Sequence, residues 1–181
     1  ALNKGINNSS GDIIGFMHSD DFYTDDKIIS QVAKIFKEKN VDIVYGDAAF
    51  FLENNTDKTV RNYISGPLTK KRLAWGFMPA HPSIFIKKNI YESIGNFKTS
   101  YKIAADYEFL CRLISKNDFK SYYLNKKLVS MQIGGVSTSG IKSTILLNKE
   151  VKRACKENKI YTNYLMLMSK YPSKILGLLS N

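Results

Sequence analysis

Residues 11–21 are Gly-Asp-Ile-Ile-Gly-Phe-Met-His-Ser-Asp-Asp. The apolar run 13–17 has the length of a short buried strand. Two acidic residues, Asp20 and Asp21, follow it almost at once. In open α/β sheets ligands bind at the carboxyl ends of strands, because loops from several elements meet there. The stretch therefore predicts a sheet strand that leads into a binding loop.

Outward from this loop, helix-like and strand-like patterns alternate, with no internal repeat and no low-complexity tract. Alternation of this kind predicts an α/β layer architecture. Further strands are expected over 42–52, 59–64, 83–86, 119–124 and 128–133, and helices over 1–8, 27–39, 68–75, 88–94, 105–115, 141–158 and 161–179.

The composition limits the class of protein. A chain of 181 residues with 44% hydrophobic and 12% aromatic residues is expected to fold as one domain with a real core, which argues against disorder. The 27 Lys and Arg against 16 Asp and Glu leave a net charge of +11, which attracts anions without naming one. Cys111 and Cys155 lie in helix-like patterns, as in a reducing, cytosolic setting. No signal peptide or membrane span is predicted, so we expect a soluble or peripheral protein.

The acidic pair has its own chemistry. Two neighbouring carboxylates repel each other unless a cation neutralises them, and a divalent metal is the economical solution. Such a metal can also bridge the oxygens of a diphosphate and neutralise the charge of a departing nucleotide. The alternative is that Asp20 and Asp21 cap the following helix, although residues 24–26 stand closer to its start.

A family resemblance joins these observations. Residues 3–6 and 10–21 resemble the segment that leads into the Asp-any-Asp motif of family 2 glycosyltransferases, which have the GT-A fold. The resemblance implies that Asp20 and Asp21 bind Mn²⁺ or Mg²⁺ on the donor diphosphate. His18 stands where the family has its first acidic residue. It is expected either to contact the nucleotide and metal or to serve as a structural partner.

Further matches extend the resemblance over about the first 140 residues. The string 44–47 resembles the strand after the metal loop, 81–88 the segment that lines the sugar cleft, and 94–97 the Gly-any-Phe turn of the family. Residues 104–113 resemble the helix whose opening Asp is the catalytic base, which implies that role for Asp106. Ala105 stands where many members carry Glu.

The residues themselves also support a base at Asp106. Displacing a nucleoside diphosphate from a sugar requires a base opposite the leaving group, and a carboxylate at a helix start is held by backbone donors. The same position suits a helix N-cap, which is the alternative. Glu108 is the next candidate, on another face of the helix, and Arg112 is either an anion partner or exposed surface.

Substrate contacts are predicted at three residues, Trp75, His81 and Glu108. An aromatic face can stack on a sugar ring, but core packing is the ordinary role of a Trp. Residues 134–140, Gly-Gly-Val-Ser-Thr-Ser-Gly, are expected to form either a lid over the donor or a plain connection.

Together these interpretations predict an incomplete GT-A fold, a mixed sheet flanked by helices, over 1–140 and a helical tail over 141–181 that packs on the domain or on a partner. The expected reaction moves a sugar, with inversion, from a nucleotide-sugar donor to a glycan or lipid-linked acceptor in cell-surface polysaccharide synthesis. The family's first strands, which hold the nucleotide, are expected to lie upstream of this chain. The apolar tail predicts a subunit contact, as in a homo-oligomer, or a peripheral contact with the inner face of the membrane.

Three other functions fit some of the sequence. A catalytically inactive relative would keep the fold and bind a glycan or a partner. A nucleotidyltransferase also binds a metal and a diphosphate on an α/β sheet, but it would leave the Asp106 region without a purpose. A nucleic-acid module rests on the charge alone, and the basic residues are scattered without a recognition motif, so no nucleic-acid partner is expected.

Overall fold

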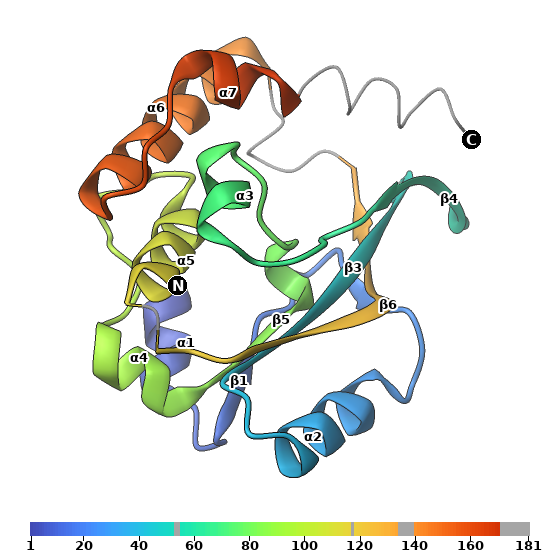
Figure 1. Ribbon diagram of the computed structural model, residues 1–181. Coiled ribbons are helices and arrows are strands. Elements are labelled where there is room, and N and C mark those ends of the chain that lie inside the picture. Colours follow the sequence, from blue (N-terminus) through green and yellow to red (C-terminus); the bar gives the residue numbers. More distant parts are fainter. Residues whose placement is uncertain (53–54, 117, 134–139, 171–181) are drawn as a thin grey trace.

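A six-stranded mixed sheet forms the centre of the protein (Figure 1). The structure is a computed structural model and describes residues 1–52, 55–116, 118–133 and 140–170. Its strands are β1 Ile13–Gly15, β2 Phe22–Tyr23, β3 Ile43–Leu52, β4 Asn55–Tyr63, β5 Ile84–Lys87 and β6 Ser121–Gln132. Its helices are α1 Leu2–Asn8, α2 Ile28–Glu38, α3 Lys70–Ala74, α4 Lys88–Ile94, α5 Ala105–Ser115, α6 Ile141–Glu157 and α7 Tyr164–Met168, with a 3₁₀ turn η1 over His81–Ser83.

The strand order is β1-β5-β3-β6-β2, and β4 also pairs with β3. The β3–β6 pair is parallel, and the other pairs are antiparallel. β5 pairs with the first residues of β3, and β4 pairs with the last ones along the same edge. β3 is therefore paired on both sides along most of its length, and its residues 43–49 are all buried because both faces of the sheet are covered there.

Alternate residues of the central strands face two different cores. Ile43 and Tyr45 of β3 belong to a large core with α5 and α6, whereas Val44 between them belongs to a smaller core with α2. β5 repeats the pattern, because Ile84 faces the large core and Phe85 the small one. This is the two-residue period of a strand buried on both faces. Helix α2 thus covers one face of the sheet, and α5 and α6 cover the other (Figure 1).

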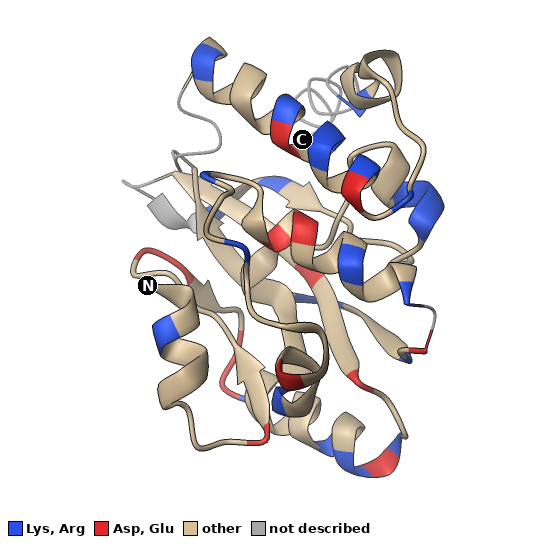
Figure 2. Cartoon of the chain, turned by 90° about the vertical axis from the view of Figure 1, so that its left-hand side faces the viewer, with Lys and Arg blue, Asp and Glu red and all other residues tan. Residues whose placement is uncertain are grey.

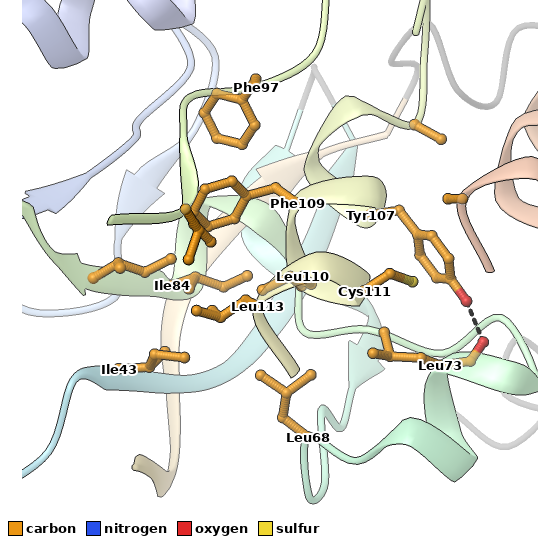
Figure 3. Packing of buried hydrophobic residues seen from close by; sticks show 14 of the residues in the cluster. Ile43, Leu68, Leu73, Ile84, Phe97, Tyr107, Phe109, Leu110, Cys111 and Leu113 are labelled. Carbon is orange, nitrogen blue, oxygen red and sulfur yellow. Dashed lines mark hydrogen bonds between the residues drawn. The ribbon is translucent and has the colours of Figure 1, made fainter. Parts of the chain in front are cut away.

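The large core is built around α5. Phe109, Leu110 and Leu113 of this helix point toward Ile43 and Ile84 of the sheet (Figure 3). The free cysteines of α5 and α6, Cys111 and Cys155, are both buried in this core. Helix α6 therefore packs directly on the helix that begins at the predicted base.

Most expected elements are present, and there are three differences. The predicted strands 119–124 and 128–133 form one continuous strand, β6, because two register shifts against β3 accommodate the polar residues between them. The short strand β2 was not predicted, since two residues carry no periodic signal. In the tail, α7 ends at Met168, and the rest of the helix expected over 161–179 lies largely outside the described residues.

None of the helices in the described part of the chain is long and apolar enough to cross a membrane. Figure 2 shows Lys and Arg spread over several helices and loops, with acidic residues between them. On this side the positive charge does not gather in a single patch.

Candidate active site

Three segments that are far apart in the sequence meet at one small hollow beside the large core. Phe16 comes from the loop after β1, His81 from η1 before β5, and Asp106 from the first turn of α5. Phe97, from the turn before α5, completes the aromatic side of the hollow. Asp106 therefore lines the same hollow as Phe16, which belongs to the loop that carries the acidic pair.

His81 lies at the centre of this group. Its ring stacks on Phe16 at 5.1 Å between centroids and meets the edge of Phe97 at 5.8 Å. The His18 ring lies 5.9 Å from it. The turn that contains His81 is attached to the sheet, because the Ser83 hydroxyl donates to the Gly46 carbonyl of β3 at 2.9 Å. Packing of this kind fixes the imidazole between the strand loop and the helix.

The electrostatics of His81 link it to both neighbours. Burial lowers the pKa of His81, the Asp106 carboxylate works in the opposite direction, and His18 lowers the pKa further. The imidazole is therefore neutral at pH 7, and it can both donate and accept hydrogen bonds.

Asp106 is the second residue of α5, so it is not the N-cap. The N-cap is Ala104, which has no side chain to cap the helix. Asp106 Oδ1 accepts a hydrogen bond from the Tyr107 backbone N–H at 2.7 Å, and the side chain is partly exposed. The next side chain points the other way, because the Tyr107 hydroxyl donates to the Leu73 carbonyl in the core (Figure 3). The first turn of α5 thus directs the carboxylate to the hollow and the phenol to the core.

The acidic pair lies on the loop between β1 and β2. Asp20 is exposed, and Asp21 is partly buried. Asp21 Oδ1 accepts the backbone N–H of Gln132 at the end of β6 at 3.3 Å, whereas Oδ2 is buried and has no hydrogen-bond partner in the described structure. Burial raises the pKa of Asp21, against the Gln132 hydrogen bond and the charge of His18, and Asp20 raises it further. The pair does not cap α2, because the N-cap of that helix is Lys27 and no side chain caps it.

His18 connects the two ends of the site. Its carbonyl accepts the backbone N–H of Asp21 at 3.3 Å, and its ring lies 5.9 Å from the His81 ring. The polar groups therefore follow one another in the order Asp21, His18, His81 and Asp106. Carboxylates stand at both ends, and two imidazoles stand between them.

The part of the chain that the structure describes contains no group of three or more His, Cys, Asp or Glu side chains placed to hold a metal. The acidic pair alone supplies hard oxygen atoms, the ligands that Mg²⁺ and Mn²⁺ prefer. The buried and unpartnered Asp21 Oδ2 fits a cation, since a carboxylate oxygen in such a place lacks compensation. A metal here would depend on additional oxygen ligands from its substrate and from water.

Glu108 differs from its prediction as a substrate contact. Its side chain is 0% exposed and pairs with Arg112 Nη2 at 3.1 Å and with Lys98 Nζ at 2.9 Å. Arg112 also donates to the carbonyls of Ile94, Gly95 and Asn96, so it is the partner of a carboxylate within the protein and not plain surface. Because both Glu108 oxygens are engaged below the surface, this arrangement argues against a contact with a substrate and for a role in holding the turn before α5.

The remaining predicted residues have separate surroundings. Trp75 follows α3 and is 39% exposed, so it does not pack in the core, and its contact with a sugar stays a prediction. Its neighbour Ala74 accepts a hydrogen bond from Thr162 near α7, which places Trp75 on that side of the domain. The predicted lid covers residues 134–140, of which all but Gly140 lie outside the described residues.

Sequence reasoning missed two residues that the structure brings to this region. The Gln132 backbone holds Asp21, and Glu150 of α6 accepts hydrogen bonds from the segment that leads into α5. A backbone contact leaves no signal in a sequence. A single Glu in a helix rich in Lys is ordinarily expected to be exposed to solvent.

A known protein family matches the part of the chain that contains these residues. The family model described as "Glycosyl transferase family 2" matches residues 1–121. An uncharacterized glycosyltransferase of Haemophilus influenzae is 26% identical over 132 residues, which cover 70% of this chain and 44% of the relative. A PGL/p-HBAD biosynthesis glycosyltransferase of Mycobacterium bovis is 22% identical over 178 residues, 98% of this chain and 65% of the relative. The chain thus spans less than two thirds of the length of these curated relatives.

Solved structures share the fold. The crystal structure of S. aureus TarS 1-349 superposes with a TM-score of 0.55 at 14% identity, covering 84% of this chain and 43% of that one. TarS 1-349 in complex with UDP-GlcNAc superposes with a TM-score of 0.56 at 14% identity, over 83% of this chain and 45% of that one. The predicted mixed α/β architecture of the GT-A type is confirmed, over part of the length of those proteins.

Proposed function

The chain belongs to glycosyl transferase family 2, and from this premise we propose that it carries the acceptor and leaving-group side of an inverting sugar transfer from a nucleotide-diphosphate donor. One observation supports the proposal above the others. Asp106 opens into the hollow that His81 and the strand-end loop share, within one line of polar groups that ends at the acidic pair. A displacement reaction requires a base and a leaving-group site on opposite sides of the sugar. In this proposal, Asp106 at one end of the line of polar groups is the base, and the acidic pair at the other end is the leaving-group site.

Asp106 is the proposed base. Its carboxylate is partly exposed and is fixed through Oδ1 by the first turn of a helix, where backbone donors stabilise a negative charge. It would take the proton of the acceptor hydroxyl as that oxygen attacks the anomeric carbon. His81, neutral and packed between two aromatic rings, is placed to orient the acceptor or donor by hydrogen bonds.

Asp20 and Asp21 are the proposed site for Mn²⁺ or Mg²⁺ and the diphosphate. When bound, a divalent ion supplies charge neutralisation for the departing nucleoside diphosphate. The residues of this chain hold and orient that end of the site: the Gln132 backbone fixes Asp21 Oδ1, which leaves Oδ2 for the ligand. His18 lies next to the pair, where it can donate to a diphosphate oxygen.

The proposal also covers the class of acceptor and the place of the reaction in the cell. We assign a glycan or lipid-linked acceptor, used in cell-surface polysaccharide synthesis on the cytoplasmic side of a membrane. Exposed apolar side chains on and near α7 support a membrane contact, since Tyr161 is 78% exposed and Leu165 84%. Lys152 lies over the ring of Tyr164 at 4.3 Å, so a basic face adjoins them.

The test uses the complete protein that carries this chain. Release of UDP from UDP-N-acetylglucosamine and other UDP-sugars is measured with Mn²⁺ or Mg²⁺, alongside binding of UDP by calorimetry. Asp106→Asn is expected to lower turnover by at least about a hundredfold with UDP affinity within about twofold, because a base acts on the reaction and not on donor binding. Asp12→Asn, at the other end of β1 and exposed, is the matched control and should behave as wild type.

Two results would contradict the proposal. Wild-type turnover by Asp106→Asn would remove this residue from the role of base. Failure of the wild-type protein to use any nucleotide sugar, with intact binding of a glycan, would favour the inactive relative.

A further inference from the structure

Glu150 of α6 holds the segment that leads into α5. Its Oε1 accepts the backbone N–H of Lys102 at 2.8 Å, and its Oε2 accepts those of Ile103 and Ala104, both at 2.9 Å. The side chain comes from 46 positions or more along the chain and is buried, with the residue 6% exposed. A buried carboxylate that accepts three consecutive backbone donors fixes the path of that backbone, because each lost bond would leave a polar group unpaired.

A second residue of the same helix acts on the same segment. Arg153 Nη2 donates to the Ser100 carbonyl at 3.0 Å, and its guanidinium lies 3.7 Å from the ring centroid of Tyr101. Glu150 and Arg153 are three positions apart, so they lie on one face of α6. That face covers the whole turn from 100 to 104. The turn therefore takes its conformation from α6 more than from its own sequence.

The turn ends at the helix that bears the proposed base. Ala104 donates its N–H to Glu150, and its carbonyl accepts the Glu108 N–H at 2.9 Å, the first hydrogen bond of α5. Asp106 follows two residues later, and no side chain caps the helix. Glu150 thus supplies from outside the fixation that an N-cap would give, at two residues from the reacting carboxylate.

We propose that Glu150 is a positioning residue for Asp106, held on α6 beyond the part of the chain that matches the family model, and that α6 therefore forms part of the catalytic unit. This inference rests on the proposed function for its catalytic consequence. The charge of Glu150 suits the role. Burial by itself raises the pKa of its carboxyl, but the three backbone donors and the charge of Arg153 together lower that pKa, so the carboxylate is charged at neutral pH.

A purely structural role would also make Glu150 important, so the test separates the two. Glu150→Gln keeps the size of the side chain, but an amide has one acceptor oxygen, and at least one of the three N–H groups must then face an NH₂ group. Glu38→Gln is the matched control: it is the same change at an ion pair with Lys34 on α2, where the Glu38 side chain is 57% exposed. The first measurement is amide hydrogen exchange by NMR. Exchange of Lys102, Ile103 or Ala104 should rise by about tenfold or more in Glu150→Gln, while the amides of β3 and β5 keep their protection in both variants.

The second measurement is UDP release from UDP-N-acetylglucosamine by the complete protein, at a temperature where all variants are folded. Small displacements of a reacting group cost up to about a hundredfold in rate, so we expect kcat to fall by about tenfold or more with KM within about twofold. In an Asp106→Asn background, Glu150→Gln should cause less than about a twofold further loss, because a residue that acts through Asp106 has nothing left to position.

The outcomes distinguish this inference from the function it rests on. An active wild type with unchanged kcat in Glu150→Gln, a full additional loss in the Asp106→Asn background, or unchanged exchange at 102–104 would overturn the positioning role and leave the proposed function standing. A wild-type protein without turnover on any UDP-sugar would overturn the proposed function and the catalytic part of this inference with it.

Discussion

Replacing Glu108 by Ala should unfold the domain at a much lower temperature, although the residue lies only two positions from the proposed base. The side chain is 0% exposed and holds two cations, Arg112 at 3.1 Å and Lys98 at 2.9 Å. Through Arg112 it also braces the carbonyls of the Ile94–Asn96 turn. Removal of one partner of a buried pair leaves the other charge without compensation, at a cost of about 3–5 kcal/mol.

The structure places the expected value near the lower end of that range. The Arg112 side chain is 16% exposed and keeps its carbonyl acceptors after the substitution, and Lys98 is 41% exposed and keeps Glu157. We therefore expect a loss of about 3 kcal/mol in the free energy of unfolding. For a chain of this size each kcal/mol shifts the unfolding midpoint by about 2–4 °C, so the midpoint should fall by about 6–12 °C.

The assay is thermal unfolding followed by circular dichroism, with Glu38→Ala as control. Lys34 and Glu38 form an ion pair of the same i,i+4 spacing at 3.7 Å on α2, but their side chains are 71% and 57% exposed. Such a pair contributes less than about 0.5 kcal/mol, and its loss should lower the midpoint by no more than about 2 °C. A shift for Glu108→Ala as small as that of the control would refute the structural assignment. If UDP release were lost at the same time, the original prediction of a substrate contact would be restored.

Three further predictions follow from the site. Because burial lowers the pKa of His81, the folded state binds fewer protons than the unfolded state. The contribution of neutral His81 to the free energy of unfolding is therefore fully present above about pH 6.5 and is lost as the pH falls below it. In His81→Gln the unfolding midpoint should decline less steeply between about pH 7.5 and 5.5 than in the wild type. The pKa of Asp21 is raised, so its ionised form opposes folding, and Asp21→Asn should raise the unfolding midpoint at pH 7 but not near pH 4. The same variant should weaken the Mn²⁺-dependent binding of UDP in calorimetry. A destabilised variant with unchanged UDP binding would contradict both expectations. Leu165→Glu should reduce co-sedimentation with vesicles of acidic phospholipid by about tenfold relative to Lys37→Glu on α2, and equal loss in both variants would show that charge alone governs the contact.

The local elements followed from the sequence because their signals are local. The bounds expected for α4 and α5 agree with the structure, since apolar residues at helical spacing and a Gly after Ile94 specify them without help from distant residues. The apolar run and the acidic pair likewise placed a binding loop at the end of β1. Resemblance to the family added an order of motifs that periodicity alone does not contain.

The parts that sequence reasoning missed depend on contacts over long separations. The sequence predicted a break between two strands at residues 125–127, yet β3 pairs with β6 on both sides of residues 124–126 and keeps it continuous. Glu108 read as a candidate for chemistry, and Lys98 and Arg112 instead bury it. Burial and pairing of a charge depend on which surfaces meet after folding, and helical spacing does not specify that.

The alternation of strands and helices, the acidic loop and the groups available for chemistry could all be predicted from the order of residues along the chain. Which of those groups share a site became clear from the packed fold. His18, His81 and Asp106 are separated by more than 20 residues each, and the sheet and α5 bring them together, while α6 fixes the turn before Asp106. Side-chain periodicity follows from local backbone geometry, whereas distant side chains meet only when whole elements pack around a common core.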